Sequence, residues 1–406
     1  MKTIAVAGTF DTKGREFAYV KGLLEELGVR PFMIHTGVFE PAFPADVTNA
    51  EIAAAVGQDI KAIVERKDRA LATETLSKGM EKLVPELYAQ GKFDGIISFG
   101  GSGGTSLVTP AMRALPIGVP KVMVSTMASG NVSQYVGTSD IVMMPSIVDV
   151  AGLNKISKMI FSNAVLAIVG MVNLRGNLKE DNSEAKPLIA ASMFGVTTPC
   201  VDKAKDYLEQ HGYEVLVFHA TGTGGKTMDA LINAGFFAGV LDLTTTEWAD
   251  EVVGGVLAAG KNRCEAAISK KIPQVVSVGA CDMVNFGPID TVPKEFSGRN
   301  LYKHNPTVTL MRTTVQENKI IGEKLASKWN AAQVPMTLLL PKKGVSMIDA
   351  DGQPFNGVEE RKTLFETLKK NINNELVEIR ELDNNINDTD FALTAAKRLV
   401  ELIERK

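Results

Sequence analysis

One glycine-rich segment organises this chain: Ser98-Phe99-Gly100-Gly101-Ser102-Gly103-Gly104-Thr105-Ser106. It follows Phe93–Ile97, an apolar run with the length of a buried strand, and precedes Leu107–Met112, which has the pattern of a helix start. Four glycines occupy five consecutive positions, so the backbone can turn sharply and present bare N–H groups. At a strand-to-helix junction, such N–H groups and the helix dipole bind phosphate or carboxylate. A tight turn without a ligand is the alternative, but a turn requires only one glycine.

Length and composition indicate a globular chain with two domains. The chain has 406 residues, more than one hydrophobic core usually spans. It is 45% hydrophobic and 22% charged, with a net charge of −3. This balance offers no general attraction to nucleic acid or to acidic membranes, so neither is expected as a partner.

We expect a cytoplasmic protein without a membrane span. The longest apolar run, Ala164–Val172, is about half the length that a membrane span needs. Met1-Lys2-Thr3 leads straight into the first expected strand, so no secretory segment is expected. The cysteines Cys200, Cys264 and Cys281 are odd in number and lack CxxC spacing, which favours a reducing compartment.

Short apolar runs alternate with helical patterns in the first half, which favours a parallel sheet. The expected strands are Thr3–Ala7, Arg30–His35, Phe93–Ile97, Val119–Thr126 and Ile141–Pro145. Helices are expected up to Leu27, over 50–90, from Leu107, and from Gly152 to about Val172. The polar segment Arg175–Pro187 has no apolar period and is interpreted as an interdomain linker.

The second half repeats this order of strands and helices. Its expected strands are Leu188–Gly195, Glu214–His219, Phe237–Val240, Ile272–Val278, Met336–Leu340 and Leu376–Leu382. Its expected helices include Met228–Ala234, Glu359–Asn371 and an amphipathic Thr389–Glu404, which suits either a sheet face or a partner subunit. The prediction is an α/β chain of two doubly wound, Rossmann-like parallel-sheet domains, 1–178 and 184–406, which face a cleft.

Ligands of open parallel sheets bind beyond the carboxyl ends of the strands, so the loops at those ends are the candidate sites. These loops are rich in Gly, Ser, Thr or Asp: Gly8–Gly14, Ser98–Thr105, Met127–Asn131, Ala220–Thr227 and Gly279–Gly287. Three of them are expected to converge at one edge of the first sheet. Their candidate binding residues are Gly8, Thr9, Asp11, Thr12, Lys13, Gly100, Gly101, Ser102, Gly103, Gly104, Thr105, Ser129, Gly130 and Asn131.

The loop Gly8-Thr9-Phe10-Asp11-Thr12-Lys13 combines a glycine, hydroxyls, a carboxylate and an ammonium group. Asp11 is the candidate ligand of Mg²⁺, and Lys13, at a helix start, is placed to meet a phosphate. In the alternative interpretation, Asp11 or Thr12 caps the helix and Lys13 is a solvent residue.

The segment Ala220-Thr221-Gly222-Thr223-Gly224-Gly225-Lys226-Thr227 nearly matches the phosphate-loop pattern G-x-x-x-x-G-K-[ST], with alanine in place of the first glycine. Two features disfavour a phosphate-loop NTPase. The preceding strand is the second of its domain, and the acidic strand that ends at Asp242 follows only about fifteen residues later. An anion site that uses Gly222, Gly224, Gly225 and Lys226 without that fold is the preferred interpretation.

The segment Gly279–Gly287 places Cys281 and Asp282 at a strand end. Cys281 as a nucleophile requires a histidine base, for which His219 and His304 are the candidates; the alternative is an inert buried thiol. No HxH or HExxH occurs, so a zinc site is not expected. The catalytic residues are unassigned, with Asp11, Lys13 and Asp282 as candidates.

Seven motifs together resemble one uncharacterised bacterial, fungal and plant family, over essentially the whole chain. It is named after the ATP-binding amino-terminal domain of the tomato mosaic virus resistance protein. The resemblance implies a two-domain α/β fold, a nucleotide site with Mg²⁺, and dimerisation, but no reaction. The motifs are Gly8–Lys13, Gly101–Thr105, Val124–Asn131, Gly137–Asp140, Met193–Cys200, Gly222–Lys226 and Gly279–Asp282.

Three functions remain open. The leading one is a cytosolic protein that binds ATP with Mg²⁺ through its glycine loops, as a homodimer. The second is an enzyme of small-metabolite catabolism that binds an anionic or phosphorylated substrate between its domains. The third is an interaction protein in which a nucleotide stabilises the binding surface.

Overall fold

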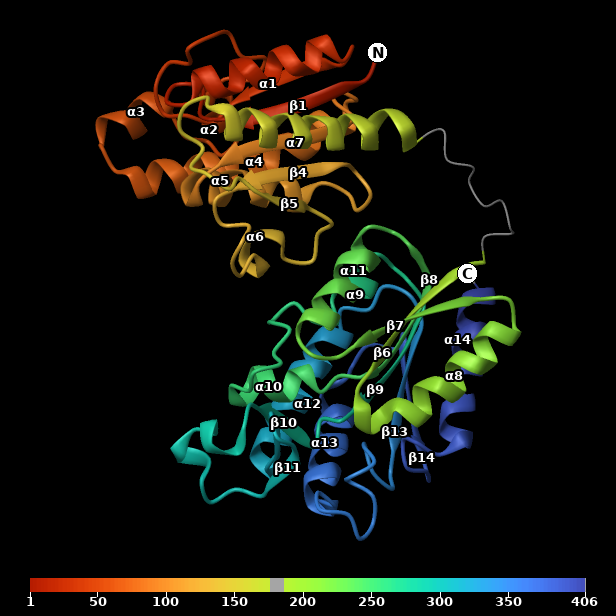
Figure 1. Ribbon diagram of the computed structural model, residues 1–406. Helices are drawn as coiled ribbons and strands as arrows, with labels where there is room; N and C mark the ends of the chain where they lie inside the picture. The colour runs from red at the N-terminus through yellow and green to blue at the C-terminus, as the bar shows by residue number, and fades with distance from the viewer. Residues whose placement is uncertain (176–185, 406) are drawn as a thin grey trace. The chain divides into compact units, whose positions relative to one another are not determined.

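The computed structural model describes residues 1–175 and 186–405 (Figure 1). The chain divides into two compact units, Met1–Asp181 and Asn182–Lys406. The predicted domain limits 178 and 184, and most of the predicted linker, lie outside the described residues, so those limits stay predictions. The cleft between the domains also stays a prediction.

The first unit is a five-stranded parallel sheet with helices on both faces. The strand order is β2 (Arg30–His35), β1 (Thr3–Gly8), β3 (Gly95–Gly100), β4 (Lys121–Ser125) and β5 (Val142–Pro145). Its longer helices are α1 (Gly14–Glu26), α4 (Arg69–Ala89), α5 (Ser102–Ala114) and α7 (Lys155–Leu174). Short helices are α2 (Asn49–Ala54), α3 (Ile60–Glu65) and α6 (Ser133–Val136).

The two faces of this sheet have separate hydrophobic cores, because successive strand residues point to opposite sides. Ile4 and Val6 of β1 pack with α1 and α7 on one face. Ala5 and Ala7 pack with α4 and α5 on the other. Burial on both faces explains why these strands read as continuous apolar runs.

The second unit has a six-stranded parallel sheet of the same order with one strand added. Its strands are β7 (Glu214–His219), β6 (Leu188–Met193), β8 (Phe237–Thr244), β9 (Gln274–Gly279), β13 (Met336–Pro341) and β14 (Val377–Leu382). In both sheets the first strand of the unit lies between its second and third, so the predicted repeat and the predicted fold class are confirmed.

Helices cover both faces of the second sheet as well. They are α8 (Thr198–Gln210), α9 (Thr223–Asn233), α10 (Glu247–Val253), α11 (Ala266–Ser269), α12 (Val315–Trp329), α13 (Val358–Asn371) and α14 (Thr389–Glu404). The closing helix α14 buries Phe391, Ala395 and Leu399 with α8 against the sheet. Its apolar face is thus used inside the unit, and the tail offers no support for a subunit interface.

A small antiparallel sheet was not predicted. It has the order β10 (Met283–Phe286), β12 (Val308–Arg312) and β11 (Leu301–Asn305). The interpretation of Gly279–Gly287 as one loop is therefore wrong for its second half. The four residues of β10 are all buried, so they show no alternation of polar and apolar side chains.

Both glycine-rich segments begin their helices earlier than predicted. The helix expected from Leu107 begins at Ser102, and the one expected from Met228 begins at Thr223. Glycine lowers helix propensity, but the first turn of a helix leaves its N–H groups unpaired in any case. The glycines therefore form the open end of a helix rather than a loop before it.

One helix, α7, passes a length-and-composition test for a membrane span. Its side chains Phe161, Val165 and Ile168 are buried in the core of the first unit. Part of α7 thus belongs to this core, with 39% of the tested window buried, and a location in the cytoplasm stays a prediction.

Candidate functional site

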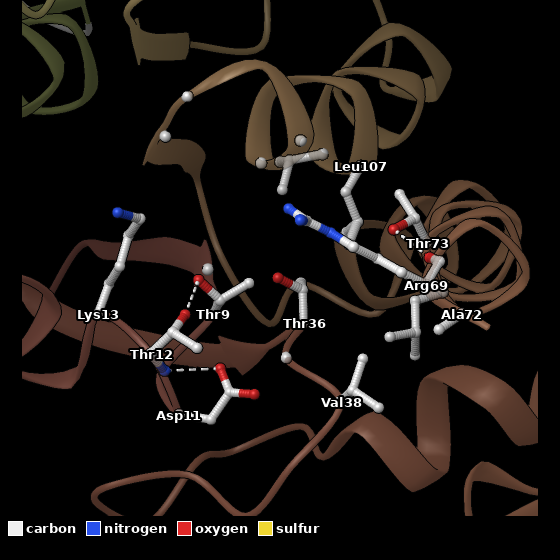
Figure 2. A pocket seen from close by; sticks show the side chains of 18 of the residues that line it. Thr9, Asp11, Thr12, Lys13, Thr36, Val38, Arg69, Ala72, Thr73 and Leu107 are labelled. Carbon is white, nitrogen blue, oxygen red and sulfur yellow. Dashed lines mark hydrogen bonds between the residues drawn. The ribbon is translucent and has the colours of Figure 1, made fainter. Parts of the chain in front are cut away.

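A pocket of about 860 Å³ opens at the carboxyl ends of β1 and β3 in the first unit (Figure 2). These strands are neighbours, and α1 leaves β1 toward one face while α5 leaves β3 toward the other. The space between two such connections is where open α/β sheets bind ligands. The lining includes residues of the predicted Gly8–Lys13 and Gly100–Gly104 segments, with others from α3, α4 and α5.

The start of α5 presents unpaired N–H groups to this pocket. Gly101 is the N-cap residue and has no side chain to cap the helix. The first bond of the helix runs from the Thr105 N–H to the Gly101 carbonyl at 3.0 Å. Among the described residues, no hydrogen bond uses the N–H groups of Ser102, Gly103 or Gly104. Free amides at a helix start favour an anion.

Ser98 is the buried polar side chain of the pocket that lacks a partner. It lies near the end of β3, is 1% exposed and lines the pocket. Its Oγ has no hydrogen-bond partner among the described residues. An unpaired buried hydroxyl costs free energy, so this donor favours a ligand with an acceptor at this position. Ser98 opens the predicted loop Ser98–Thr105, but it was not among the predicted binding residues; Phe99 separates it from the first glycine, Gly100.

Arg69, the first residue of α4, adds a positive charge beside the start of α5. Its guanidinium extends from α4 toward that helix in Figure 2, and its Nη2 lies 3.7 Å from where a Cβ on Gly103 would stand. No ion pair between described residues involves Arg69. A charged, bidentate donor beside free amides suits a phosphate.

The loop after β1 is folded by its own side chains. The Asp11 carboxylate accepts hydrogen bonds from the N–H groups of Thr12 at 2.8 Å and Phe39 at 3.0 Å. The Thr12 hydroxyl donates to the Thr9 hydroxyl at 3.1 Å (Figure 2). The Lys13 ammonium group donates to the Val150 carbonyl. Asp11 therefore keeps lone pairs for a cation, whereas Lys13 already has one protein partner.

His35 joins the loops after β1 and β2. Its Nδ1 accepts from the Phe10 N–H at 3.2 Å, and its Nε2 lies 2.8 Å from the Phe39 carbonyl oxygen, to which it donates. These partners fix the orientation of the fully buried ring. The sequence analysis gave this histidine no role, and its position at a strand end was the available signal.

Four of the binding residues predicted in the first unit do not line the pocket. The Thr105 hydroxyl donates to the Gly101 carbonyl oxygen at 2.7 Å and lies 2.6 Å from the Ser125 hydroxyl. Its hydrogen bonds thus stabilise the start of α5 and its contact with β4. The loop of Ser129, Gly130 and Asn131 follows β4, one strand further from the pocket. The Asn131 side chain there accepts from the Ser133 N–H at 3.0 Å.

In the second unit, the chain supplies its own anion to the Gly222–Thr227 segment. The Glu247 carboxylate, 1% exposed, accepts from the N–H groups of Gly222 at 2.7 Å and Gly225 at 3.1 Å. A Cβ on Gly225 would stand 2.3 Å from the same carboxylate. Lys226 is exposed. The local pattern for anion binding was real, but it did not reveal that the anion is a side chain.

Glu247 belongs to a buried charge network. Arg263 donates from Nε to Glu247 at 2.6 Å and from Nη1 and Nη2 to Asp242 at 2.6 and 2.7 Å. Burial raises the pKa of neighbouring Asp229 to about 7. Asp242, which stands where a phosphate-loop protein would hold Mg²⁺, is thus an ion-pair partner of Arg263.

Asp282 and Cys281 are buried in the second unit. The Asp282 carboxylate accepts from the Ser346 hydroxyl at 2.8 Å, while its other oxygen has no partner among the described residues. Burial raises the pKa of Asp282 to about 7, and the Asp349 carboxylate adds to the shift. Burial also raises the pKa of the Cys281 thiol to about 12, so the thiolate that a nucleophile needs is disfavoured.

The described residues contain no group of three or more His, Cys, Asp or Glu side chains arranged to hold a metal ion. A magnesium ion that accompanies a nucleotide needs no such group, because phosphates and waters supply most of its ligands. The single carboxylate of Asp11 fits that requirement.

Sequence comparisons identify relatives of both units. The profile of the "Uncharacterised protein family (UPF0261) N-terminal domain" matches residues 2–177, and that of its C-terminal domain matches residues 186–403. A UPF0261 protein of Clostridium tetani (strain Massachusetts / E88) is 53% identical over 405 residues, which covers 100% of both chains. A UPF0261 protein of Rhizobium meliloti (strain 1021) is 43% identical and covers 97% of this chain and 98% of its own.

A plant protein shares most of the chain as well. The ToMV resistance protein Tm-1(GCR237) of Solanum lycopersicum is 47% identical over 337 residues. The match covers 82% of this chain but 45% of the tomato protein, so more than half of that protein lies outside the match.

Proposed function

The chain belongs to the uncharacterised protein family UPF0261, and we propose that its first unit binds a nucleotide with Mg²⁺, with ATP as the expected ligand. The observation that carries the proposal is the combination of free α5 amides with the unpaired Ser98 hydroxyl in one pocket. Both features are donors without acceptors, and phosphate oxygens are acceptors.

Each part of the lining has a role in this proposal. The N–H groups of Ser102, Gly103 and Gly104 hold phosphate oxygens, and Arg69 balances their charge. Asp11 holds the magnesium ion together with those phosphates and water. A bound Mg²⁺ would neutralise phosphate charge in the pocket.

The test uses a methyl group as a steric probe. Gly103→Ala adds a Cβ with no backbone obstruction, because its nearest neighbour is the end of the Arg69 side chain at 3.7 Å. We expect Mg-ATP binding, measured by calorimetry, to weaken about tenfold or more, since hydrogen bonds to charged groups contribute about 1.5–3 kcal/mol each.

Gly22→Ala is the matched control. Gly22 lies on α1 with nothing within 4 Å of its Cβ position, so the same substitution should leave binding unchanged. Equal affinities of the parent and the Gly103→Ala variant would place the nucleotide elsewhere. A parent that binds a sugar phosphate or a small carboxylate, but no nucleotide, would favour the enzyme of small-metabolite catabolism.

We also propose that the protein is cytoplasmic, as its cysteine usage suggests, and that it forms a homodimer, as the family resemblance implies. Light scattering at micromolar concentration should then give twice the chain mass of 43.6 kDa. A single 43.6 kDa species would contradict the dimer.

A further inference from the structure

The pocket has a second half whose chemistry differs from that of the glycine loops. It lies between α3, α4 and α5 and is called here the apolar compartment. Figure 2 shows Val38, Ala72 and Leu107 on this side, away from Lys13 and Asp11. The compartment is lined by Val38, Ile63, Ala72, Leu76, Leu107 and Val108.

Small side chains on the sheet make room for this compartment. Ala7 of β1 stands beside Ser98 of β3 in the strand register. Ala5, Ala7 and Ile96 face α4 and α5, and strand alternation puts Ser98 on the same face. Larger residues at Ala7 and Ser98 would fill the space beneath the helices, as they do in an ordinary core.

Apolar side chains dominate the wall of this compartment. The Thr73 hydroxyl already donates to the Arg69 carbonyl at 2.9 Å (Figure 2). Ser98 lines the pocket together with Phe99, Gly100 and Gly101, at the end of β3. A ligand that is polar throughout would leave its own donors and acceptors unpaired against Ile63, Leu76 and Val108.

We infer that the ligand of this pocket joins an anionic group, held at the α5 start, to an apolar body that fills the compartment between α3, α4 and α5. This inference rests on the proposed anion site. Two sources supply such chemistry: the flat base of a nucleotide, and an alkyl or acyl chain attached to a phosphate. Inorganic anions and sugar phosphates lack the apolar body.

The experiment compares compounds that carry the same kind of phosphate group but differ in the apolar part attached to it. Calorimetry compares methyl, butyl and hexyl phosphate with each other, and ATP with inorganic tripolyphosphate. If a chain enters the compartment, affinity rises about fourfold for each added methylene. If a base enters it, ATP binds about tenfold or more tighter than tripolyphosphate, in the range of a buried aromatic contact.

Filling the compartment should remove these gains. Ala72 is 4% exposed and lines the pocket, so Ala72→Leu places a branched side chain in the ligand's space, and Ala72→Ser makes the wall polar at nearly constant size. Both should cancel the chain-length or base-dependent gain and leave methyl phosphate and tripolyphosphate binding unchanged. Ala70→Leu and Ala70→Ser, on the exposed side of α4, are the matched controls and should behave as the parent.

The outcomes separate the two proposals. Equal affinities for ATP and tripolyphosphate, with no gain along the alkyl series, overturn the apolar-body inference and leave the anion site standing. A gain along the alkyl series without any binding of ATP supports the inference and overturns the nucleotide proposal. Absence of binding for every anion overturns both. A gain that persists in Ala72→Leu and Ala72→Ser places the body elsewhere and overturns the inference.

Discussion

The Glu247 carboxylate accepts a hydrogen bond from the Gly225 N–H at 3.1 Å, inside a glycine segment that reads as a phosphate loop. The same oxygen accepts from Gly222, and the second oxygen accepts from Arg263. Among the described residues of the first unit, no carboxylate accepts from the amides at the α5 start, and these amides face an open pocket. The two glycine segments are similar, but they differ in the partners of their amides. The amides of the second unit bind the Glu247 side chain, whereas those of the first unit face a pocket.

Glu247→Ala should destabilise the second unit strongly. Removal of one partner from a buried charge network leaves Arg263 undercompensated and the loop amides unpaired, which costs about 3–5 kcal/mol. Urea unfolding followed by circular dichroism measures the loss. Glu251→Ala on the same helix is the control, because no ion pair or side-chain hydrogen bond between described residues involves Glu251. A loss below about 1 kcal/mol would show that the network is not a stabilising unit.

Ser98→Ala should raise stability slightly while it lowers ligand affinity. The unbound protein loses an unpaired buried hydroxyl, whose burial costs about 1–3 kcal/mol, although the small cavity left behind offsets part of this gain. The complex loses a hydrogen bond to a charged group, so Mg-ATP should bind about tenfold or more weakly. Urea unfolding and calorimetry on the same preparations test both signs.

Ser125→Ala gives the matched contrast for Ser98. The Ser125 hydroxyl lies 2.6 Å from the Thr105 hydroxyl and accepts from the Met127 N–H at 3.0 Å, so its removal should lower stability by about 1–3 kcal/mol. If Ser98→Ala lowers stability as much as Ser125→Ala does, the Ser98 hydroxyl has a partner within the protein.

Asp11→Asn should reduce the magnesium-dependent part of nucleotide binding. The substitution removes the charge that attracts the cation and keeps the shape of the side chain. Calorimetry with ATP in the presence and absence of Mg²⁺ should therefore show a smaller difference than in the parent. Asp59→Asn, at the start of α3 and outside the pocket lining, should keep the parent's difference. An unchanged magnesium effect in Asp11→Asn would remove Asp11 from the metal site.

Asp250 should make the second unit less stable as pH rises toward neutrality. Burial raises its pKa from 3.8 to about 7 in the folded protein. Between these values the folded state binds one proton more than the unfolded state, so this group's contribution to stability falls by about 1.4 kcal/mol per pH unit. Above pH 7 the contribution is constant, because both states are then ionised.

Asp250→Asn isolates this effect, since it cannot ionise. The free energy of unfolding of the parent minus that of Asp250→Asn should fall by about 1.4 kcal/mol per pH unit as pH rises from 5 to 7. The Asn285 side-chain amide donates to Asp250 at 2.8 Å, and its oxygen is unpaired. In the Asp250→Asn variant this amide group can rotate by half a turn, so that its oxygen accepts from the introduced side-chain NH2 group. A flat difference for Asp250→Asn would mean that Asp250 is ionised throughout this range.

Much of the fold was predictable because its signals are local. The strands Arg30–His35 and Glu214–His219 and the helix Thr389–Glu404 have the predicted bounds. The strand β10 was not predicted because all four of its residues are buried, so its sequence lacks the alternation of polar and apolar residues that marks a strand. The helix starts at Ser102 and Thr223 were missed because glycine content alone suggests a loop.

The sequence alone was sufficient for the order of strands, the position of polar loops at their carboxyl ends, and the presence of two glycine-rich segments between a strand and a helix. These follow from apolar runs and glycine spacing, which act over a few neighbouring residues. The tertiary structure decided which backbone is open. Glu247 is 22 residues from Gly225 in the chain. Ser125 is 20 residues from Thr105, whose hydroxyl is hydrogen-bonded to the Ser125 hydroxyl. Whether a polar group finds a partner depends on such distant contacts, so the unpaired Ser98 hydroxyl and the compartment beside it emerge only once the helices are packed on the sheet.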